Sequence, residues 1–234
     1  MKKVLFILLA SVLSFGSAQA IDYNFSVGVS LNQSVFAATG KEDNYSETGV
    51  SGGSIVTEEY GAFKDSYPSI FAEVGLNESF SVGLSAQGQF GTPTNVNERC
   101  TSNQANCDSA GETTPTSTVN ADFESYLIAY GKVNIPLGGL YVKGGLSRVD
   151  VVVNEAQASG NTYPDTDTTG YMVAIGYQID MEASGLSLRA EVQGHAFDDV
   201  QVNNGKSKSS GNYNSVTVSD MIGASGTISL VKTF

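Results

Sequence analysis

The chain has no tryptophan, one histidine, two cysteines and half as many basic residues as acidic ones, 12 against 24. Its formal net charge is −12. An acidic surface repels phosphate backbones, so we expect no nucleic-acid partner. The same shortage of Lys and Arg argues against a polybasic protein that binds the membrane surface. With one histidine and no Gly-rich phosphate loop before a helix, we expect no bound metal and no cofactor.

Long apolar runs are also missing, because no stretch approaches the roughly 18 residues of a transmembrane helix. A short run over residues 4–13 follows Lys2 and Lys3 and precedes the small-residue pattern of residues 17–20. A positive start, a short apolar run and a small-x-small pattern are typical of a secretory signal. We therefore predict a signal peptide over residues 1–20 and one exported domain over residues 21–234. The alternative is a first helix that anchors the chain in a membrane.

Cys100 and Cys107 lie close together in a polar stretch. In an oxidising compartment such a pair favours a disulfide that closes a small loop. A zinc site is the alternative, but it needs further ligands, and His195 lies in a different segment. Asp165 and Asp167 could likewise hold a divalent cation, although we favour a solvated acidic loop.

What the sequence does contain is strand-forming and turn-forming residues, arranged in eight segments. We predict strands over residues 23–38, 60–76, 79–90, 121–135, 140–153, 169–180, 185–200 and 216–234. Long connections follow the first, third, fifth and seventh segments, and short turns follow the second, fourth and sixth. In an up-and-down barrel this parity places all long loops at one rim, as in bacterial outer-membrane barrels. We therefore expect an all-β, eight-stranded antiparallel transmembrane barrel in the bacterial outer membrane.

The strands alternate with a period of two. Phe25, Val27 and Val29 share one face of the first strand, while Ser26 and Gly28 share the other. A face of polar residues and glycine recurs in nearly every strand. A soluble fold would then have too little apolar surface to fill a core, so we assign the apolar face to lipid and the polar face to the lumen.

Charges on the polar face would project into the lumen, since Arg or Lys facing lipid costs about 2–4 kcal/mol at the midplane. The predicted lumen charges are Glu73, Glu124, Lys132, Lys143, Arg189 and Glu191. An eight-stranded barrel is just wide enough for side chains to fill. Because three acids match three bases, we interpret the set as a structural plug. A conduction path or a proton-sensitive gate is the alternative.

Aromatic residues gather near the ends of the predicted strands, where rings form girdles at the membrane interfaces. The predicted girdle residues are Tyr23, Phe36, Tyr60, Phe63, Phe90, Phe123, Tyr171, Phe197 and Phe234.

The last segment ends on alternating apolar residues, with Ile228 and Leu230 before a terminal Phe234. This ending resembles the C-terminal signal that the barrel-assembly machinery reads, except that Lys232 stands where an apolar residue is common. There the amine is expected to snorkel to the periplasmic interface. With the eight-strand pattern, the chain resembles the OmpA-like and opacity-type small outer-membrane barrels. The resemblance implies a structural, antigen-like or adhesin-like role, with lipid and the assembly machinery as partners.

The long loops could bind an extracellular ligand, and a closed barrel without a free edge favours a monomer. A small passive porin is the alternative function, and a secreted lipocalin-like carrier the third. We expect no enzyme. His195 near Asp198 and Asp199 could pair with a serine as a nucleophilic site, but no G-x-S-x-G elbow occurs.

Overall fold

The computed structural model describes residues 24–46, 53–91, 95–98, 116–156, 162–181, 185–207 and 212–234. The predicted signal sequence and both cysteines, Cys100 and Cys107, lie outside the described residues. Within the described part, no helix is long and apolar enough to span a membrane.

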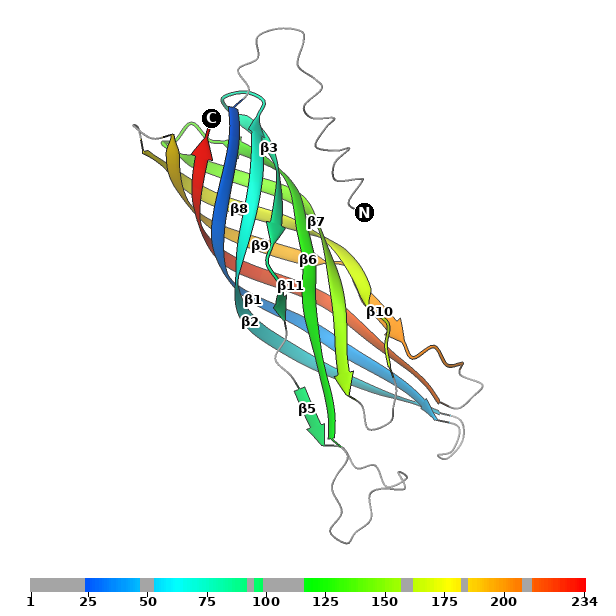
Figure 1. Ribbon diagram of the computed structural model, residues 1–234. Coiled ribbons are helices and arrows are strands. Elements are labelled where there is room, and N and C mark those ends of the chain that lie inside the picture. The colour runs from blue at the N-terminus through cyan, green and yellow to red at the C-terminus, as the bar shows by residue number, and fades with distance from the viewer. Residues whose placement is uncertain are drawn as a thin grey trace.

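Eleven strand segments form one antiparallel sheet (Figure 1). They are β1 (Asn24–Ser46), β2 (Gly53–Gly75), β3 (Phe80–Gln87), β4 (Phe90–Gly91), β5 (Asn95–Glu98), β6 (Thr116–Asn134), β7 (Leu140–Ala156), β8 (Thr166–Met181), β9 (Leu186–Phe197), β10 (Val200–Asn203) and β11 (Asn212–Thr233). Eight of them follow one another around the ring in chain order, and β11 returns to pair with β1 from Ser26↔Thr233 to Ser46↔Asn212. The sheet is therefore a closed barrel, and the predicted eight-stranded up-and-down fold is confirmed. β4 and β5 extend the wall along β6, and β10 extends it along β11.

Short turns join β2 to β3 and β6 to β7 at one end of the barrel, where β8 also ends and β9 begins (Figure 1). In the first of these, the Asn77 side chain accepts hydrogen bonds from the backbone N–H of Ser79 and Phe80, at 2.9 and 2.8 Å. Such Asx turns explain why asparagine reverses the chain here. β1 starts and β11 ends at this rim, where the Phe234 N–H donates to the Phe25 carbonyl at 2.9 Å.

The outer surface carries an apolar band. On β1 it runs from Phe25 to Val35, which matches the 9–11 residues of a transmembrane β-strand. Its large exposed members include Val27, Val29, Leu31, Ile70, Leu127, Val133, Leu146, Val173, Ile175, Ile179, Leu188, Val192, Ile222, Ile228 and Leu230. So much exposed apolar surface is the lipid-facing surface of a membrane barrel.

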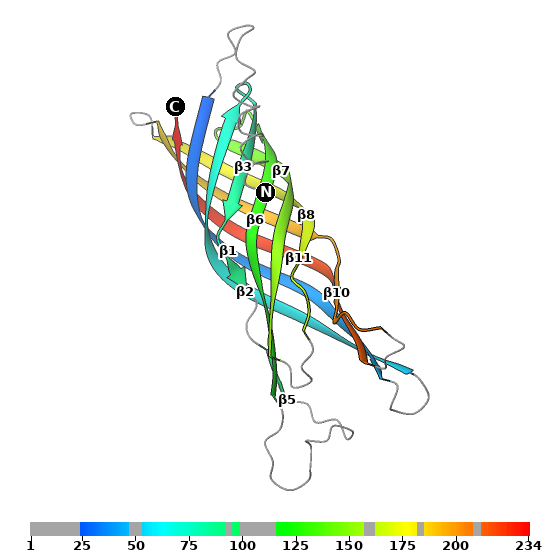
Figure 2. The same cartoon turned by 45° about the vertical axis from the view of Figure 1, so that its right-hand side comes forward.

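The strands continue beyond this band at the end opposite the short turns (Figure 2). β1 and β2 each have 23 residues, and their outer parts pair without a break up to Ser46↔Gly53. The predicted loop of about twenty residues after the first strand is therefore wrong, because residues 39–46 and 53–59 are strand. This hairpin carries exposed charges such as Lys41, Glu58 and Glu59, as expected of a sheet that stands in water.

Candidate functional site

The lumen of the barrel is the candidate functional site. Strand β9 contributes side chains along the whole length of it. On β9 the side chains of Arg189, Glu191, Gln193, His195 and Phe197 share the inner face. Alternate residues along a strand point the same way and advance by about 7 Å per pair. The lumen therefore passes from a charged cluster near the short turns, through a polar chamber, to an aromatic layer near the outer end of the apolar band.

Glu73 is the centre of the charged cluster and is 3% exposed. Its carboxylate lies 2.6 Å from the Lys132 ammonium and 2.7 Å from Arg189 Nη1, while Arg189 Nη2 is 3.1 Å away. The Tyr130 hydroxyl donates a further hydrogen bond to it at 3.0 Å. Arg189 Nε in turn donates to Gln178 at 2.7 Å. These charge-assisted bonds offset the cost of burying the three ions.

Glu191 forms a second centre beside the first. Lys143 lies 2.5 Å away, and the Tyr141 hydroxyl donates to the same oxygen at 2.6 Å. Gln193 donates to the other oxygen at 2.9 Å. The rings of Tyr130 and Phe71 flank the Lys143 ammonium, with centroids 4.7 and 5.4 Å away. The structure thus brings together five of the six predicted lumen charges.

Glu124 does not join this cluster, so its placement in the lumen is wrong. The pairing of β6 with β7 shifts between Glu124 and Leu127, and Ser125 has φ 50°, which marks a β-bulge. Phe123 and Tyr126 are both buried, so one extra residue reverses the alternation between them. Glu124 is instead half-buried. In the strand register it lies opposite Asp150, whose neighbours on β7, Val149 and Val151, are both buried.

A small polar chamber lies next to the charged cluster. Side chains from all eight long strands line it, and its cavity is about 20 Å³, room for one or two water-sized species. The Ser30 and Ser229 hydroxyls, 2.8 Å apart, form part of its wall, as do Gln87, Gln193 and Lys143.

His195 points inward, as predicted, but its partners differ from those that the sequence suggested. Nδ1 lies 2.9 Å from the Tyr126 hydroxyl, and Nε2 lies 2.6 Å from the Ser225 hydroxyl. Asp198 instead accepts a hydrogen bond from the Thr169 hydroxyl. The side chains of Ser225, His195 and Tyr126 are each at least 95% buried, and their hydrogen bonds tie β6, β9 and β11 together.

Seven aromatic side chains pack together in the lumen beyond His195. The layer consists of Phe36, Phe63, Tyr67, Phe90, Phe123, Tyr126 and Phe197, and neighbouring rings have centroids 4.6 to 6.3 Å apart. The girdle prediction is wrong for the five residues that belong to this layer, Phe36, Phe63, Phe90, Phe123 and Phe197, while Tyr23 lies outside the described residues. It fails because these residues lie on the inner face, although they are near the outer end of the apolar band. Tyr60, Tyr171 and Phe234 do face outward.

The aromatic layer also spans an interruption in the wall. Pairing of β2 with β3 stops at Ser69↔Gln87, and beyond it the Gly88 N–H donates to the Pro68 carbonyl at 2.7 Å. Across this seam the Tyr67 ring of β2 stacks on Phe90 of β4, with centroids 4.6 Å apart. Ring stacking therefore joins the two sides where the strand pairing ends.

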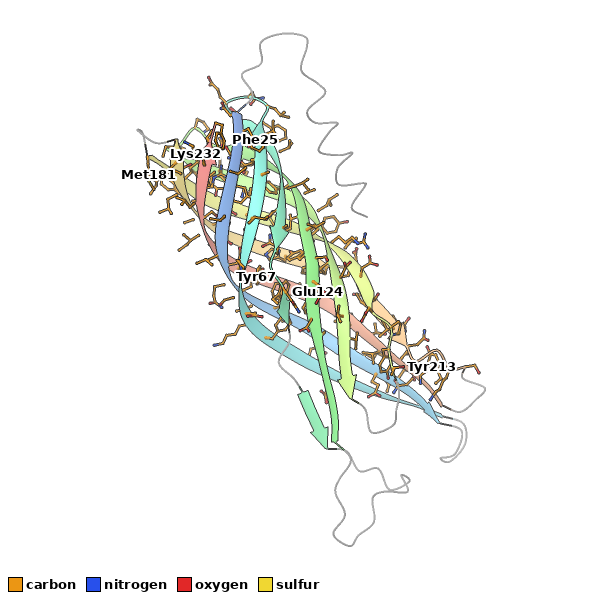
Figure 3. All side chains as sticks on the ribbon, in the orientation of Figure 1. Phe25, Tyr67, Glu124, Met181, Tyr213 and Lys232 are labelled. Atoms are coloured by element: carbon orange, nitrogen blue, oxygen red, sulfur yellow. The ribbon has the colours of Figure 1, made fainter. Side chains whose placement is uncertain are left out.

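The predicted assembly residues lie on the final strand. Ile228 and Leu230 face outward, and Phe234 is 70% exposed beside Phe25, with ring centroids 6.3 Å apart. The Lys232 ammonium lies 5.6 Å from the Phe234 ring centroid, at the rim with the short turns (Figure 3).

The described residues contain no group of three or more His, Cys, Asp or Glu side chains placed to hold a metal ion. Asp167 instead lies 3.3 Å from Arg148, and Asp165 accepts a hydrogen bond from the Val153 N–H at 3.2 Å. Both aspartates thus have protein partners.

No protein-family model and no curated protein matches the chain. Solved structures similar to it include the outer membrane protein OprG from Pseudomonas aeruginosa, with 14% identity over 88% of this chain and 95% of that one, at a TM-score of 0.46. The outer membrane protease OmpT from Escherichia coli has 10% identity over 94% of this chain and 100% of that one, at a TM-score of 0.45. The attachment invasion locus protein Ail of Yersinia pestis has 10% identity over 87% and 99%, at a TM-score of 0.36.

Sequence identities and TM-scores this low carry no argument about function. The barrel is established by the strand pairing of the chain itself. The ring closes through the pairing of β1 with β11, so neither end of the sheet is left as a free edge in lipid. The ring also carries an outward apolar band, short turns at one rim and longer connections at the other, the arrangement of outer-membrane barrels. The chain is therefore a transmembrane β-barrel of the bacterial outer membrane.

Proposed function

We propose that this protein has a structural or surface-exposed role, in the manner of an antigen or adhesin, and that its lumen does not conduct. The observation that supports the proposal is that two clusters of side chains pack into the lumen. The ion cluster around Glu73 and Glu191 fills the end near the short turns, and the aromatic layer fills the other. Between them the chamber holds only about 20 Å³.

The extended hairpin of β1 and β2 supports the surface-exposed part of the proposal. Both strands run well past the apolar band, so this part of the barrel would stand outside the membrane with the long connections. A continuous paired sheet is a rigid platform for loops that meet an extracellular partner. Outer-membrane lipid and, during insertion, the barrel-assembly machinery are the other partners we propose, with the barrel itself monomeric.

Planar-bilayer recording on the refolded mature chain tests the closed lumen. We expect no stepwise conductance over hours of recording in 1 M KCl, an ordinary test condition. Regular steps of uniform size would overturn the proposal and favour the second candidate, a passive pore for small solutes. The polar chamber, lined by all eight long strands, is the feature that favours such a pore.

Surface exposure needs its own test. A short epitope inserted after Gly205, an exposed residue between β10 and β11, should be detected by antibody on intact cells. The same epitope inserted after Leu137, in the turn between β6 and β7, should be detected only after the outer membrane is permeabilised. Detection of the second epitope alone on intact cells would reverse the orientation and contradict the surface role.

A further inference from the structure

The buried ionisable cluster carries an excess of positive charge. Among the described residues, the buried bases are Lys132, Lys143 and Arg189, and the buried acids are Glu73 and Glu191. Glu124, which would have balanced the set, is carried out of the lumen by the bulge on β6. An unbalanced charge away from water is costly, so the protein gains if a counter-charge lies nearby.

The excess is not shared evenly between the two centres. Glu73 binds both Lys132 and Arg189, at 2.6 and 2.7 Å, so its surroundings are the more positive. Asp180 is the other acid in this region, and Gln178 donates to it at 2.6 Å. Its side chain lies at the rim and is exposed, where water screens its effect on the cluster.

Lys143 connects the cluster to the polar chamber. Its single hydrogen bond within the described structure goes to Glu191, at 2.5 Å, while an ammonium has three donors. The rings of Phe71, Tyr130 and Tyr141 surround it at 4.7 to 5.6 Å, and the same ammonium-bearing side chain lines the chamber. The ammonium therefore has hydrogen-bonding capacity to offer toward the chamber.

The rest of the chamber wall has the chemistry that solvates a small anion. The Ser30, Ser69 and Ser229 hydroxyls and the Gln87 and Gln193 amides contribute to it. Hydroxyl and amide groups can each turn an N–H or O–H toward a negative ion. The cavity of about 20 Å³ has room for one or two water-sized species, which suits a halide.

We propose that this chamber binds one small monovalent inorganic anion of the size of chloride. Lys132, Lys143 and Arg189 all lie 5.4 to 5.7 Å from the Tyr141 ring centroid, so the two centres adjoin and an anion beside Lys143 also balances the excess charge around Glu73. The anion receives a hydrogen bond from Lys143 and takes further donors from the serine and glutamine side chains. A water molecule has the same size but supplies no charge. The site does not depend on whether the lumen conducts, because the anion is a resident counter-ion.

The direct test is crystallography of the refolded chain in sodium bromide, with diffraction recorded at the bromine absorption edge. An anomalous peak in the chamber, in contact with Lys143, is the expected result. Density for water without an anomalous peak would overturn the proposal.

A solution test uses the thermal unfolding midpoint in chloride and in gluconate at equal ionic strength. Since a ligand of the native state stabilises it by mass action, the midpoint should rise with chloride concentration and not with gluconate. Gln87→Glu places a carboxylate in the chamber wall, so its midpoint should no longer depend on chloride. Gln201→Glu makes the same change at an exposed position on β10 and should keep the dependence.

Equal midpoints for the unmodified chain in chloride and gluconate would overturn the proposal, as would an equal chloride dependence in both variants. If Gln87→Glu does not fold, Ser229→Asp serves instead, because it places a carboxylate in the chamber wall from β11.

Discussion

Arg189 on β9 and Glu73 on β2 form a two-point ion pair across the lumen, with nitrogen–oxygen distances of 2.7 and 3.1 Å. β11 and β1 lie between these strands in the ring, so no backbone pairing connects them. The planar guanidinium matches a carboxylate at two points, which fixes orientation as well as distance. The pair therefore ties opposite parts of the wall together.

Glu73→Gln should destabilise the barrel strongly, because it leaves Lys132 and Arg189 without their carboxylate. Removing one partner of a buried ion pair costs about 3–5 kcal/mol. Urea unfolding in lipid vesicles measures this loss. Glu59→Gln, on the exposed part of the same strand, is the matched control and should change the free energy of unfolding by less than about 0.5 kcal/mol. Equal effects of the two changes would contradict the role of the cluster.

Gly176→Ala should lower stability by about 1–3 kcal/mol through overpacking. The Tyr141 ring lies over Gly176, and an added Cβ would meet its Cζ at 2.4 Å. The displaced ring would also lose its hydrogen bond to Glu191. Gly144→Ala is the control, since nothing lies within 4 Å of its added Cβ. Chemical denaturation of both variants is the measurement, and a tolerated Gly176→Ala would show that the ring is not held there.

Phe90→Ala should cost about 3–5 kcal/mol, because it opens a cavity in the middle of the aromatic layer. The Phe90 ring contacts Tyr67, Phe123 and Phe36, with centroids 4.6, 5.0 and 5.1 Å away. Tyr60→Ala removes a ring that is 83% exposed and should have little effect. Unfolding midpoints of the two variants compare them, and similar midpoints would mean that the layer contributes little to closure of the seam.

Val173→Arg tests the lipid-facing surface. Val173 is 65% exposed in the apolar band of β8, and an Arg at the bilayer midplane costs about 2–4 kcal/mol. Asn203→Arg, at an exposed position on β10, should cost much less. Folding yield and unfolding in vesicles measure both. An unchanged stability for Val173→Arg would remove the band from the bilayer.

The membrane-spanning part of the fold was predictable because its signal is simple. Each strand there places apolar residues against lipid and small polar residues in the lumen, so Val27 and Val29 against Ser26 and Gly28 already give the face. The outer halves of β1 and β2 give no such signal. Their exposed residues are mostly polar or charged, and backbone pairing such as Lys41↔Glu58 joins the two strands.

The residues that face the lumen could be predicted only where inward-facing and outward-facing residues alternate strictly along a strand. Glu124 and Lys132 have the same parity in the sequence, but the bulge at Ser125 separates their faces. The aromatic layer was missed for a related reason. Phe36 and Phe63 lie near strand ends, where girdles occur, and only the register shows that they face each other inside the barrel.

Several glycines lie opposite an aromatic ring on the neighbouring strand. This pattern cannot be recognised from the sequence alone. The Phe71 ring covers Gly28, Tyr130 covers Gly83, Tyr141 covers Gly176 and Phe36 covers Gly223, and each pair is a cross-strand partner. Finding such pairs requires the register of neighbouring strands, which depends on turn and bulge positions.

The central claim is that the chain forms a closed barrel that spans a membrane. Heat-modifiability on a gel tests this claim most directly. Residues 21–234 are refolded in detergent, and their migration is compared before and after boiling, with a parallel sample kept free of detergent. A shift in migration on boiling, seen only with detergent, is the result that the structure predicts. A chain that stays soluble, monomeric and β-rich without detergent, with no shift, would contradict it.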